Sequence, residues 1–553
     1  MKRLLVLSLL VVPSLFAAET HRYIVATTHG SRAMKLRALS AAGDATARNV
    51  REFESIDGFA VDLTDAEAAE MRKSAGVRYV SRTIEIHAVG NVAPPHLAPH
   101  ADASPMQLAQ TVPPNIDLVH ARDVWPLTRG GNVNIAIIDT GVDFAHADLA
   151  ANIVGGYNTH TKDTNYFDDN LHGTHVAGII GALDNSLGVV GVAPAAHIYA
   201  VKALDADGSG TDEDIVAAAD WVLAWKHTKG GNWIVSMSLG AHGVSAAEEE
   251  AFQRLIADGV LCIAASGNDG GLFDMLYPAA LPGVVSVGAV DNNKVIADFS
   301  TPGPTLNVVA PGVSVLSTLP TASIRRALTN LANGTTLPSA MITGTALGEV
   351  TGDWVYCAYG AAGDFPPETR GRIAIISRGM SLSFSEKVRN ARDAGAIGAV
   401  IVNNVLGNIS TWTLINPVCD QQTCHGDPSD LGYPWPVVVT MATADGAKLM
   451  ANAKQQRITI NAYLDDYGSL SGTSMATPHV TGIAALAWSL APTATAKQVA
   501  AALRGSAIDL GPPGVDNSYG FGMVDALATA RYLAPAAFGL PPRPDTRSRA
   551  AHH

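Results

Sequence analysis

The chain has 553 residues, of which 47% are hydrophobic and only 16% are charged. This length exceeds one comfortable hydrophobic core, so we expect about two to four globular domains and not a disordered chain. The formal net charge is -13, and no basic stripe offsets it, which argues against nucleic acid as a partner because phosphate binding needs a basic face.

Residues 1–18 have the three-part form of a secretory signal peptide. Basic residues at 2–3 precede an apolar run over 4–16, and small residues follow at 17–18. Because this run is too short to span a bilayer, we interpret it as a cleaved leader and not as a membrane anchor. No later apolar run is long enough to span either, so the sequence predicts a secreted, extracellular protein.

Residues 19–89 are predicted to form a small α+β unit. A helix with acidic residues in its first turn begins at Thr64, and three strand patterns surround it. Those strands are residues 21–26, 58–63 and 77–80. Taken by itself, the unit is a candidate for a separate binding domain. The following residues 90–108 are rich in Pro, His and Ala without periodicity, which predicts a linker.

The region after the linker alternates strands with amphipathic helices. Such alternation predicts an α/β domain of three layers, in which helices cover both faces of a parallel sheet. The strand patterns are residues 134–139, 198–202, 233–238, 260–265 and 284–288. The first of them ends in Asp139, at the carboxyl end of a strand, where open α/β sheets place their functional sites.

Two later segments carry the groups that an activated nucleophile requires. Ser474 lies in Gly-Thr-Ser-Met-Ala-Thr-Pro-His, where Pro478 suits the first turn of a helix. A lone Gly-Thr-Ser is more often a helix cap. However, His172 opens a second apolar helix, and a serine becomes nucleophilic when a histidine takes its proton and a carboxylate orients that histidine. Asp139, His172 and Ser474 supply these groups in that chain order.

The segments Ile-Ile-Asp-Thr-Gly, His-Gly-Thr-His-Val-Ala-Gly and Gly-Thr-Ser-Met-Ala-Thr-Pro-His resemble the three signature blocks of the subtilisin-like serine peptidases. This resemblance implies that Asp139 orients, His172 acts as general base and acid, and Ser474 is the nucleophile. Residues 265–268 resemble the oxyanion segment of the same family, which implies that Asn268 donates its amide to the tetrahedral intermediate.

The resemblance also implies a function for the whole chain. It implies a secreted serine endopeptidase that hydrolyses peptide bonds in proteins through an acyl-enzyme. Residues 19–89 then resemble the family's inhibitory propeptide, which assists folding and lays its last strand in the active site. Autoprocessing is expected between about Val89 and Gln110. The partners are protein or peptide substrates and the chain's own propeptide, and we expect a monomer. The alternative is a catalytically silent protein that binds peptides or proteins.

Two backbone segments resemble the edges between which this family clamps an extended peptide. Backbone pairing accepts almost any sequence, so specificity depends on side-chain pockets. Leu276 falls where the family has the floor of its main pocket, and it should favour a medium apolar side chain over a large aromatic one. The edge residues are Gly208, Ser209, Gly210, Ser238, Leu239 and Gly240.

A structural Ca²⁺ site is implied for the loop at 183–189, and no organic cofactor is expected. Calcium takes six to eight oxygen ligands from carboxylates, amides and carbonyls. The alternative is an ordinary loop. His172 and His175 are not interpreted as a metal pair, because a base at a helix start cannot also be a ligand. The implied ligands are Gln110, Asp148, Leu183, Asn185, Leu187 and Val189.

An insertion separates the two parts of the catalytic domain, which are residues 109–335 and 466–535. Compact family members pass between these parts in a short loop, whereas here residues 336–465 resemble a protease-associated domain. It could guard the cleft, hold a protein substrate or act as a spacer. Residues 536–553 form a Pro- and Arg-rich tail.

The chain has four cysteines, which is few for a secreted protein of this size. Cys262 lies within an apolar strand and is predicted to be a buried free thiol. Two of Cys357, Cys419 and Cys424 are expected to pair. Cys419 and Cys424 are nearest in sequence, but spacing does not give the connectivity.

Overall fold

The central domain is built on a parallel sheet whose strands are buried on both faces. The computed structural model describes residues 19–28, 49–89, 110–321, 323–404, 414, 435–451 and 456–541. In spatial order the seven strands are β14 (Val308–Pro311), β13 (Val285–Val290), β12 (Leu261–Ala265), β10 (Asn232–Met237), β6 (Val133–Asp139), β8 (His197–Lys202) and β7 (Ile153–Asn158). Near-continuous apolar runs such as that of β6 are typical of strands covered on both sides.

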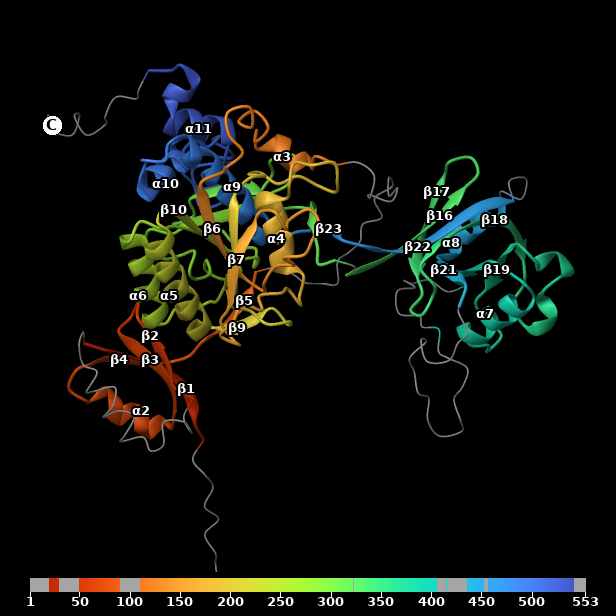
Figure 1. Cartoon of the computed structure of the whole chain (residues 1–553), viewed down its shortest axis with the longest axis horizontal. Coiled ribbons are helices and arrows are strands. Elements are labelled where there is room, and N and C mark those ends of the chain that lie inside the picture. The colour runs from red at the N-terminus through yellow and green to blue at the C-terminus, as the bar shows by residue number, and fades with distance from the viewer. Residues whose placement is uncertain are drawn as a thin grey trace, which may run out of the picture.

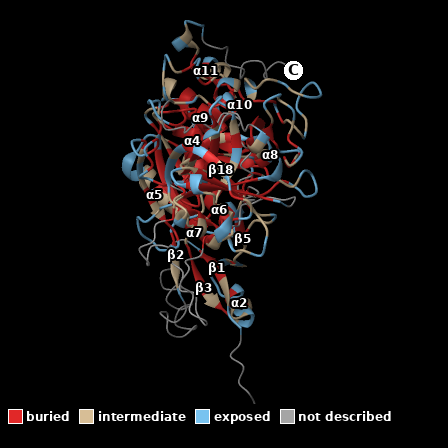
Figure 2. Cartoon of the chain, turned by 90° about the vertical axis from the view of Figure 1, so that its right-hand side faces the viewer, coloured by how far each residue is buried: buried red, intermediate tan, exposed pale blue. Residues whose placement is uncertain are grey.

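Two helical layers cover this sheet, as Figure 1 shows. In β6, Ile135 and Ile137 pack into the core that also contains residues of α4 (His172–Gly181) and α9 (Thr473–Leu490). Ala136 and Ile138 point to the opposite core, with α5 (Asp212–Lys229) and α6 (Ala246–Ala257). Figure 2 shows buried residues gathered around α4 and α9. The predicted three-layer α/β fold is therefore confirmed.

The sheet has two strands that the sequence analysis did not predict. β7 and β14 are its edge strands. β7 contains Gly155 and Gly156, and β14 ends at Pro311, so neither has the long β-branched run that marks a strand in sequence.

Among the described residues, none of the helices combines the length and hydrophobicity that crossing a bilayer requires.

α9 differs in one respect from the expected helix. It begins at Thr473, which places Pro478 in its second turn and not its first. Because proline has no N–H, the carbonyl of Ser474 lacks its usual partner four residues later. Ser238 compensates, since its Oγ donates a hydrogen bond to the Ser474 carbonyl at 2.9 Å. A side chain from the junction of two strands, β10 and β11, thus satisfies the acceptor that the proline leaves free.

In its described residues, the N-terminal unit forms a four-stranded sheet and the helix α2. In spatial order its strands are β2 (Arg51–Phe53), β3 (Gly58–Leu63), β1 (His21–Thr27) and β4 (Val77–Arg82). Helix α2 (Asp65–Arg72) starts with a capping box between Thr64 and Glu67. The unit lies against α5 and α6. Its Arg22 donates to Glu213 at 2.6 and 2.8 Å, and its Arg78 donates to Glu250 at 2.8 Å.

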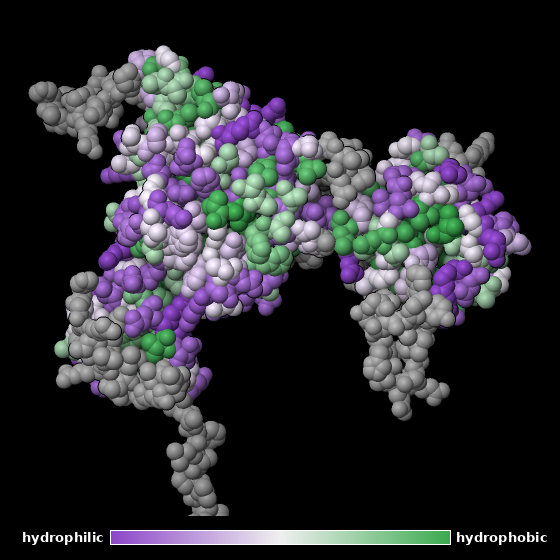
Figure 3. All heavy atoms as spheres, viewed as in Figure 1, coloured by the Kyte–Doolittle hydropathy of each residue, from purple (hydrophilic) through white to green (hydrophobic). Residues whose placement is uncertain are grey.

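The insertion is a closed seven-stranded barrel that stands to one side of the central domain (Figure 1). Figure 3 shows hydrophilic and hydrophobic residues mixed over the visible face of both. In spatial order the strands are β16 (Ile324–Leu331), β17 (Thr336–Met341), β21 (Val437–Met441), β20 (Gly398–Val402), β19 (Ile373–Ser377), β18 (Gly348–Tyr356) and β22 (Arg457–Asp465). Its helices are α7 (Phe384–Asp393) and α8 (Thr443–Ala451).

The barrel begins earlier than the expected insertion boundary at residue 336. β16 belongs to it and pairs along its whole length with β22, from Ile324 opposite Asp465 to Leu331 opposite Ile458. This pairing joins segments more than a hundred residues apart, which local pattern cannot reveal. β15 (Val315–Thr318) and β23 (Tyr467–Leu470) pair where the chain leaves and re-enters the central domain.

The central domain also contains α3 (Pro114–Leu118), β9 (Ser209–Thr211), β11 (Leu239–Gly240), α10 (Ala496–Gly505) and α11 (Ala526–Leu533). The last strand of the N-terminal unit is β5 (Glu85–Ala88). Cys262 is a buried free thiol, as predicted, and Cys357 is also buried and free. Cys419 and Cys424 lie outside the described residues, so their pairing stays a prediction.

Candidate active site

Asp139 and His172 meet at the end of β6 and the start of α4. His172 Nδ1 lies 2.7 Å from Asp139 Oδ1, and both side chains are buried. Burial by itself would lower the pKa of His172, but the Asp139 carboxylate outweighs it and Asp168 adds to the effect, so the pKa is raised. The carboxylate therefore fixes the ring and favours its protonated form.

His175, three residues later, has a different environment. Its Nε2 lies 3.0 Å from the carbonyl oxygen of Gly468, and burial lowers its pKa to about 3. A neutral histidine held by a backbone carbonyl is a structural group. The two histidines of the His-x-x-His pattern, His172 and His175, thus have different hydrogen-bond partners and different pKa shifts.

Ser474 lies at the start of α9, close to the end of the N-terminal unit. Its Oγ contacts the carbonyl oxygen of Val89 and donates to the carbonyl oxygen of Ser238 at 3.1 Å. Within the described part of the chain, His172 Nε2 has no hydrogen-bond partner. In this state the serine hydroxyl faces Val89 and is not bonded to the histidine.

Asn268 follows β12 and faces the same carbonyl group. Its Nδ2 donates to the Val89 oxygen at 3.3 Å. Its Oδ1 accepts hydrogen bonds from the backbone N and the Oγ1 of Thr473, both at 2.9 Å. Because Thr473 uses the amide oxygen, the amide nitrogen is directed at Val89.

The last strand of the N-terminal unit occupies the cleft between the two predicted edges. β5 lies between β9 and β11 and pairs antiparallel with both. Beyond the paired residues, Ala88 N donates to Gly208 O and Val89 N donates to Ser238 O, each at 2.9 Å. The Val89 side chain packs with Ala265 and Leu276 in a small apolar cluster. The strand therefore lies as an extended peptide with its last carbonyl at Ser474.

Comparison with known proteins agrees with this geometry. The profile of the Subtilase family matches residues 130–348 and 361–522, and that of Peptidase inhibitor I9 matches residues 15–87. The chain belongs to the subtilase family. It is a serine endopeptidase made as a self-inhibited precursor, and the N-terminal unit is its prosegment.

The relatives of this subtilase include bacterial subtilisins and a protein of solved structure. Subtilisin DY of Bacillus licheniformis is 43% identical over 242 residues, which cover 43% of this chain and 84% of that protein. Subtilisin E of Bacillus subtilis (strain 168) is 34% identical over 301 residues, covering 54% and 71%. The crystal structure of a psychrophilic subtilisin-like protease from Pseudoalteromonas sp. AS-11 matches with a TM-score of 0.50 and 32% identity, covering 78% of this chain and 99% of that one.

The residues of the expected calcium site also come together in this subtilase. Asp148 accepts hydrogen bonds from Asn185 Nδ2 and Val189 N, each at 2.9 Å. Gln110 Nε2 donates to the carbonyl oxygens of Leu183 at 2.6 Å and Val189 at 3.2 Å. Leu187 N donates to Asn185 Oδ1 at 2.6 Å. The Asp148 carboxylate, the side-chain amides of Gln110 and Asn185 and the carbonyl oxygens of Leu183 and Val189 thus lie together.

Sequence reasoning missed Asp168, which connects β6 to α4. Its Oδ1 accepts from Thr140 Oγ1 at 2.9 Å, and its Oδ2 accepts from the N and Oγ1 of Thr174 at 2.8 and 2.6 Å. Thr140 Oγ1 in turn accepts from Gly173 N at 2.9 Å. Asp168 lies three residues before Leu171, the N-cap of α4, so the usual N-cap pattern in the sequence does not identify it.

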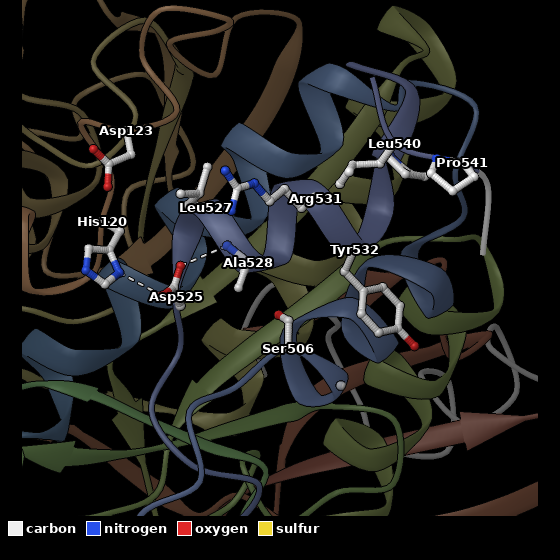
Figure 4. A pocket seen from close by; sticks show the side chains of 12 residues that line it. His120, Asp123, Ser506, Asp525, Leu527, Ala528, Arg531, Tyr532, Leu540 and Pro541 are labelled. Atoms are coloured by element: carbon white, nitrogen blue, oxygen red, sulfur yellow. Dashed lines mark hydrogen bonds and ion pairs between the residues drawn. The ribbon is translucent and has the colours of Figure 1, made fainter. Parts of the chain in front are cut away.

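A hollow beside α11 contains other polar side chains but none of the residues discussed above (Figure 4). His120 Nδ1 lies 2.7 Å from Asp525 Oδ2, and Asp525 Oδ1 accepts from Ala528 N at 2.8 Å. Asp525 is the N-cap of α11. One oxygen of Asp525 thus caps the helix and the other lies at His120. The hydroxyl of Ser506, also labelled in Figure 4, is hydrogen-bonded to the Ala502 carbonyl at 2.7 Å and to Thr529 Oγ1 at 2.9 Å.

Proposed function

We propose that Asp139, His172 and Ser474 are the catalytic triad of this subtilase and that Asn268 binds the oxyanion. The observation that carries this proposal is the position of the Val89 carbonyl oxygen, between Ser474 Oγ and Asn268 Nδ2. A carbonyl placed between a hydroxyl and a preorganised amide donor has the arrangement that acyl transfer requires.

In the reaction, the Ser474 side chain first turns toward His172 Nε2, which takes its proton as Oγ attacks the carbonyl carbon. Asp139 keeps the ring oriented through Nδ1 and stabilises the imidazolium that forms. Asn268 Nδ2 donates to the oxyanion as negative charge develops. His172 then gives its proton to the leaving amine, and water resolves the acyl-enzyme with the same base.

We also propose that the peptide bond after Val89 is the one cleaved during maturation. The carbonyl of Val89 is the group that lies at Ser474 and Asn268. The Val89 side chain is 5% exposed and packs on Leu276, itself 7% exposed. Because Leu276 packs against the Val89 side chain, the pocket that holds this side chain is shallow. The same pocket in the free enzyme should therefore accept apolar side chains of medium size. The edge residues at 208–210 and 238–240 bind the backbone of substrates in the same way.

A calcium ion would be held by Gln110, Asp148, Leu183, Asn185, Leu187 and Val189. All six can offer oxygen, the ligand that Ca²⁺ prefers. The amides of Gln110 and Asn185 now direct nitrogen at neighbouring oxygens, and a half-turn of each amide would present oxygen instead. The donors offered are one carboxylate, two amides and three backbone carbonyls, an oxygen-only set that suits calcium and not zinc. Bound calcium would tie the loop to Asp148.

We also propose where the enzyme acts and what kind of domain the barrel is. The leader at residues 1–18 lies outside the described residues, but it agrees with relatives such as the minor extracellular protease Epr of Bacillus subtilis (strain 168), 36% identical over 276 residues. We propose an extracellular, monomeric enzyme. The barrel is proposed to be a protease-associated domain, with its start moved to β16.

One experiment tests the central assignments. The secreted protein is incubated with a fluorophosphonate probe and then digested for mass spectrometry. Ser474 should carry the probe, Ser474→Ala should carry none, and the mature N-terminus should be Gly90. Labelling elsewhere would overturn the nucleophile, and a different N-terminus would overturn the maturation site.

A further inference from the structure

A pair of carboxylic acids lies beneath the prosegment strand, outside the residues assigned above. Asp212 is the first residue of α5, and Glu248 lies in the first turn of α6. Both side chains are 0% exposed. Burial raises the pKa of Asp212 to about 6, and burial with the neighbouring Asp212 raises that of Glu248 to about 8. The enzyme thus keeps two adjacent acids away from water.

These acids have oxygens without a donor. Asp212 Oδ1 accepts from Ile84 N at 3.1 Å, and Asp212 also bonds to the side chain of Ser245. Within the described ranges, Asp212 Oδ2 and both oxygens of Glu248 have no hydrogen-bond partner. Buried polar groups are normally paired, so an orphaned carboxyl indicates a missing partner.

The cations of the prosegment do not supply that partner. They bind the acids that flank the pair and leave Asp212 and Glu248 unpaired. The ion pairs are Arg22 with Glu213, Arg51 with Asp214 and Arg78 with Glu250. Tyr79 Oη also donates to Glu250, at 2.9 Å. Arg22 of β1, Arg51 of β2 and Arg78 of β4 are therefore already paired with acids other than Asp212 and Glu248.

Two residues on one face of the prosegment strand adjoin the pair. Ile84 lies opposite Asp212, whose N donates to the Ile84 carbonyl oxygen at 3.0 Å. Ile86, two residues further on, pairs with Gly210. Side chains alternate along a strand, and Ile86 is buried while Glu85 and His87 are exposed. Ile86 also belongs to the same apolar cluster as Ile215, one turn after Asp212 on α5, and Ala247, which precedes Glu248. Counting back from Val89, Ile86 is the fourth residue before the proposed bond.

We infer that Asp212 and Glu248 form a subsite that selects protein substrates with lysine or arginine four residues before the cleaved bond. This inference rests on the proposed function, because it takes its register from Val89. The aliphatic stem of a lysine can lie in the apolar cluster to which Ile86 belongs, while its head reaches the carboxylates. Ile86 fills the apolar part of this subsite and leaves both acids without a cationic partner among the described residues. The prosegment should then bind this subsite more weakly than a cationic substrate does. Weak binding suits an inhibitor that must dissociate.

The first test compares two peptide anilides on the mature enzyme, Lys-Ala-Ala-Val and norleucine-Ala-Ala-Val. Norleucine has the length of the lysine stem without its charge. We expect kcat/KM to favour lysine by roughly 10- to 100-fold, the range of a charged hydrogen bond. Asp212→Asn combined with Glu248→Gln should remove the preference, whereas Glu249→Gln, an exposed neighbour on α6, should keep it.

The outcomes separate this inference from the proposed function. If the wild-type enzyme cleaves norleucine as well as lysine, or if the preference survives in the double variant, the subsite is refuted. If neither peptide is cleaved, the proposed function fails instead.

A second test leaves the catalytic domain unchanged. In the full chain, Ile86→Lys should bind the acid pair and slow the release of the cleaved prosegment at least severalfold relative to Ile86→Met, which has similar length without charge. Activity is followed after secretion as the prosegment dissociates. Faster activation of Ile86→Lys than of Ile86→Met would contradict the inference even if the acid variants do not fold.

Discussion

Asn268 Nδ2 donates a hydrogen bond at 3.3 Å to the carbonyl oxygen of Val89, a residue 179 positions earlier in the chain. We propose that this carbonyl belongs to the first peptide bond that the enzyme cleaves. The prosegment strand in the cleft ends at that bond, so the proposal accounts for both inhibition and maturation.

Replacement of Asn268 by alanine should reduce kcat and leave KM nearly unchanged. The amide gains most of its interaction energy as charge develops on the oxyanion. We expect the roughly 100- to 1000-fold loss already known for the oxyanion-hole asparagine of subtilisin itself. Steady-state kinetics on one peptide anilide would measure it, with Asn293→Ala in an exposed turn as control. A change confined to KM would contradict the assigned role.

Activity should fall on the acid side as His172 gains a proton. Asp139 and Asp168 hold the pKa of His172 above its ordinary value against the effect of burial, and the protonated ring cannot act as base. The acid limb of kcat/KM against pH should therefore lie at or above about 6.5, the value of an unperturbed histidine. A limb clearly below this value would show that Asp139 does not stabilise the imidazolium in the mature enzyme.

The uncleaved precursor should lose stability as the pH rises toward 8. Burial raises the pKa of Asp212 to about 6 and that of Glu248 to about 8. From about pH 4 upward the unfolded chain ionises these acids while the folded precursor does not, which favours unfolding until the pH passes the folded-state values. Thermal melts of Ser474→Ala between pH 5 and 8 would measure this loss. The additional change Glu248→Gln should flatten the curve, and an unchanged slope would be evidence against a buried acid pair.

Removal of calcium should lower the melting temperature of the mature enzyme. Ligand that binds only the folded state stabilises it by about 2.7 kcal/mol at a concentration one hundred times its dissociation constant. Chelation should therefore destabilise the wild-type enzyme and the exposed surface variant Asp117→Asn by similar amounts. It should have little further effect on Asp148→Asn, which lacks the central carboxylate. Equal sensitivity of all three proteins would refute the site.

Ser238→Ala should destabilise the protein through helix α9. The Ser474 carbonyl loses its helical partner at Pro478 and accepts from Ser238 Oγ instead. Without that hydroxyl, a buried carbonyl is left unsatisfied, at a cost of about 1–3 kcal/mol. Urea denaturation would report the change, with the exposed Ser323→Ala as control. A midpoint shift no larger than that of the control would mean that water reaches the carbonyl.

The sequence by itself determined the family, the fold and the candidate triad. Asp139, His172 and Ser474 each lie in a short segment whose chemistry and local structure are specified together. A carboxylate ends a buried strand, and the other two residues begin apolar helices. Such local signals survive in sequence because a strand end or a helix start depends on a few neighbouring residues.

Only the tertiary structure decided which distant backbones meet. β16 joined the barrel through pairing with β22, and β5 entered the cleft with Val89 at Ser474. In sequence, Glu248 is one of three consecutive glutamates at the start of an amphipathic helix. Its burial beside Asp212 depends on the packing of α5, α6 and the prosegment strand. Burial shifts the pKa of a carboxyl group more than any neighbour in sequence can.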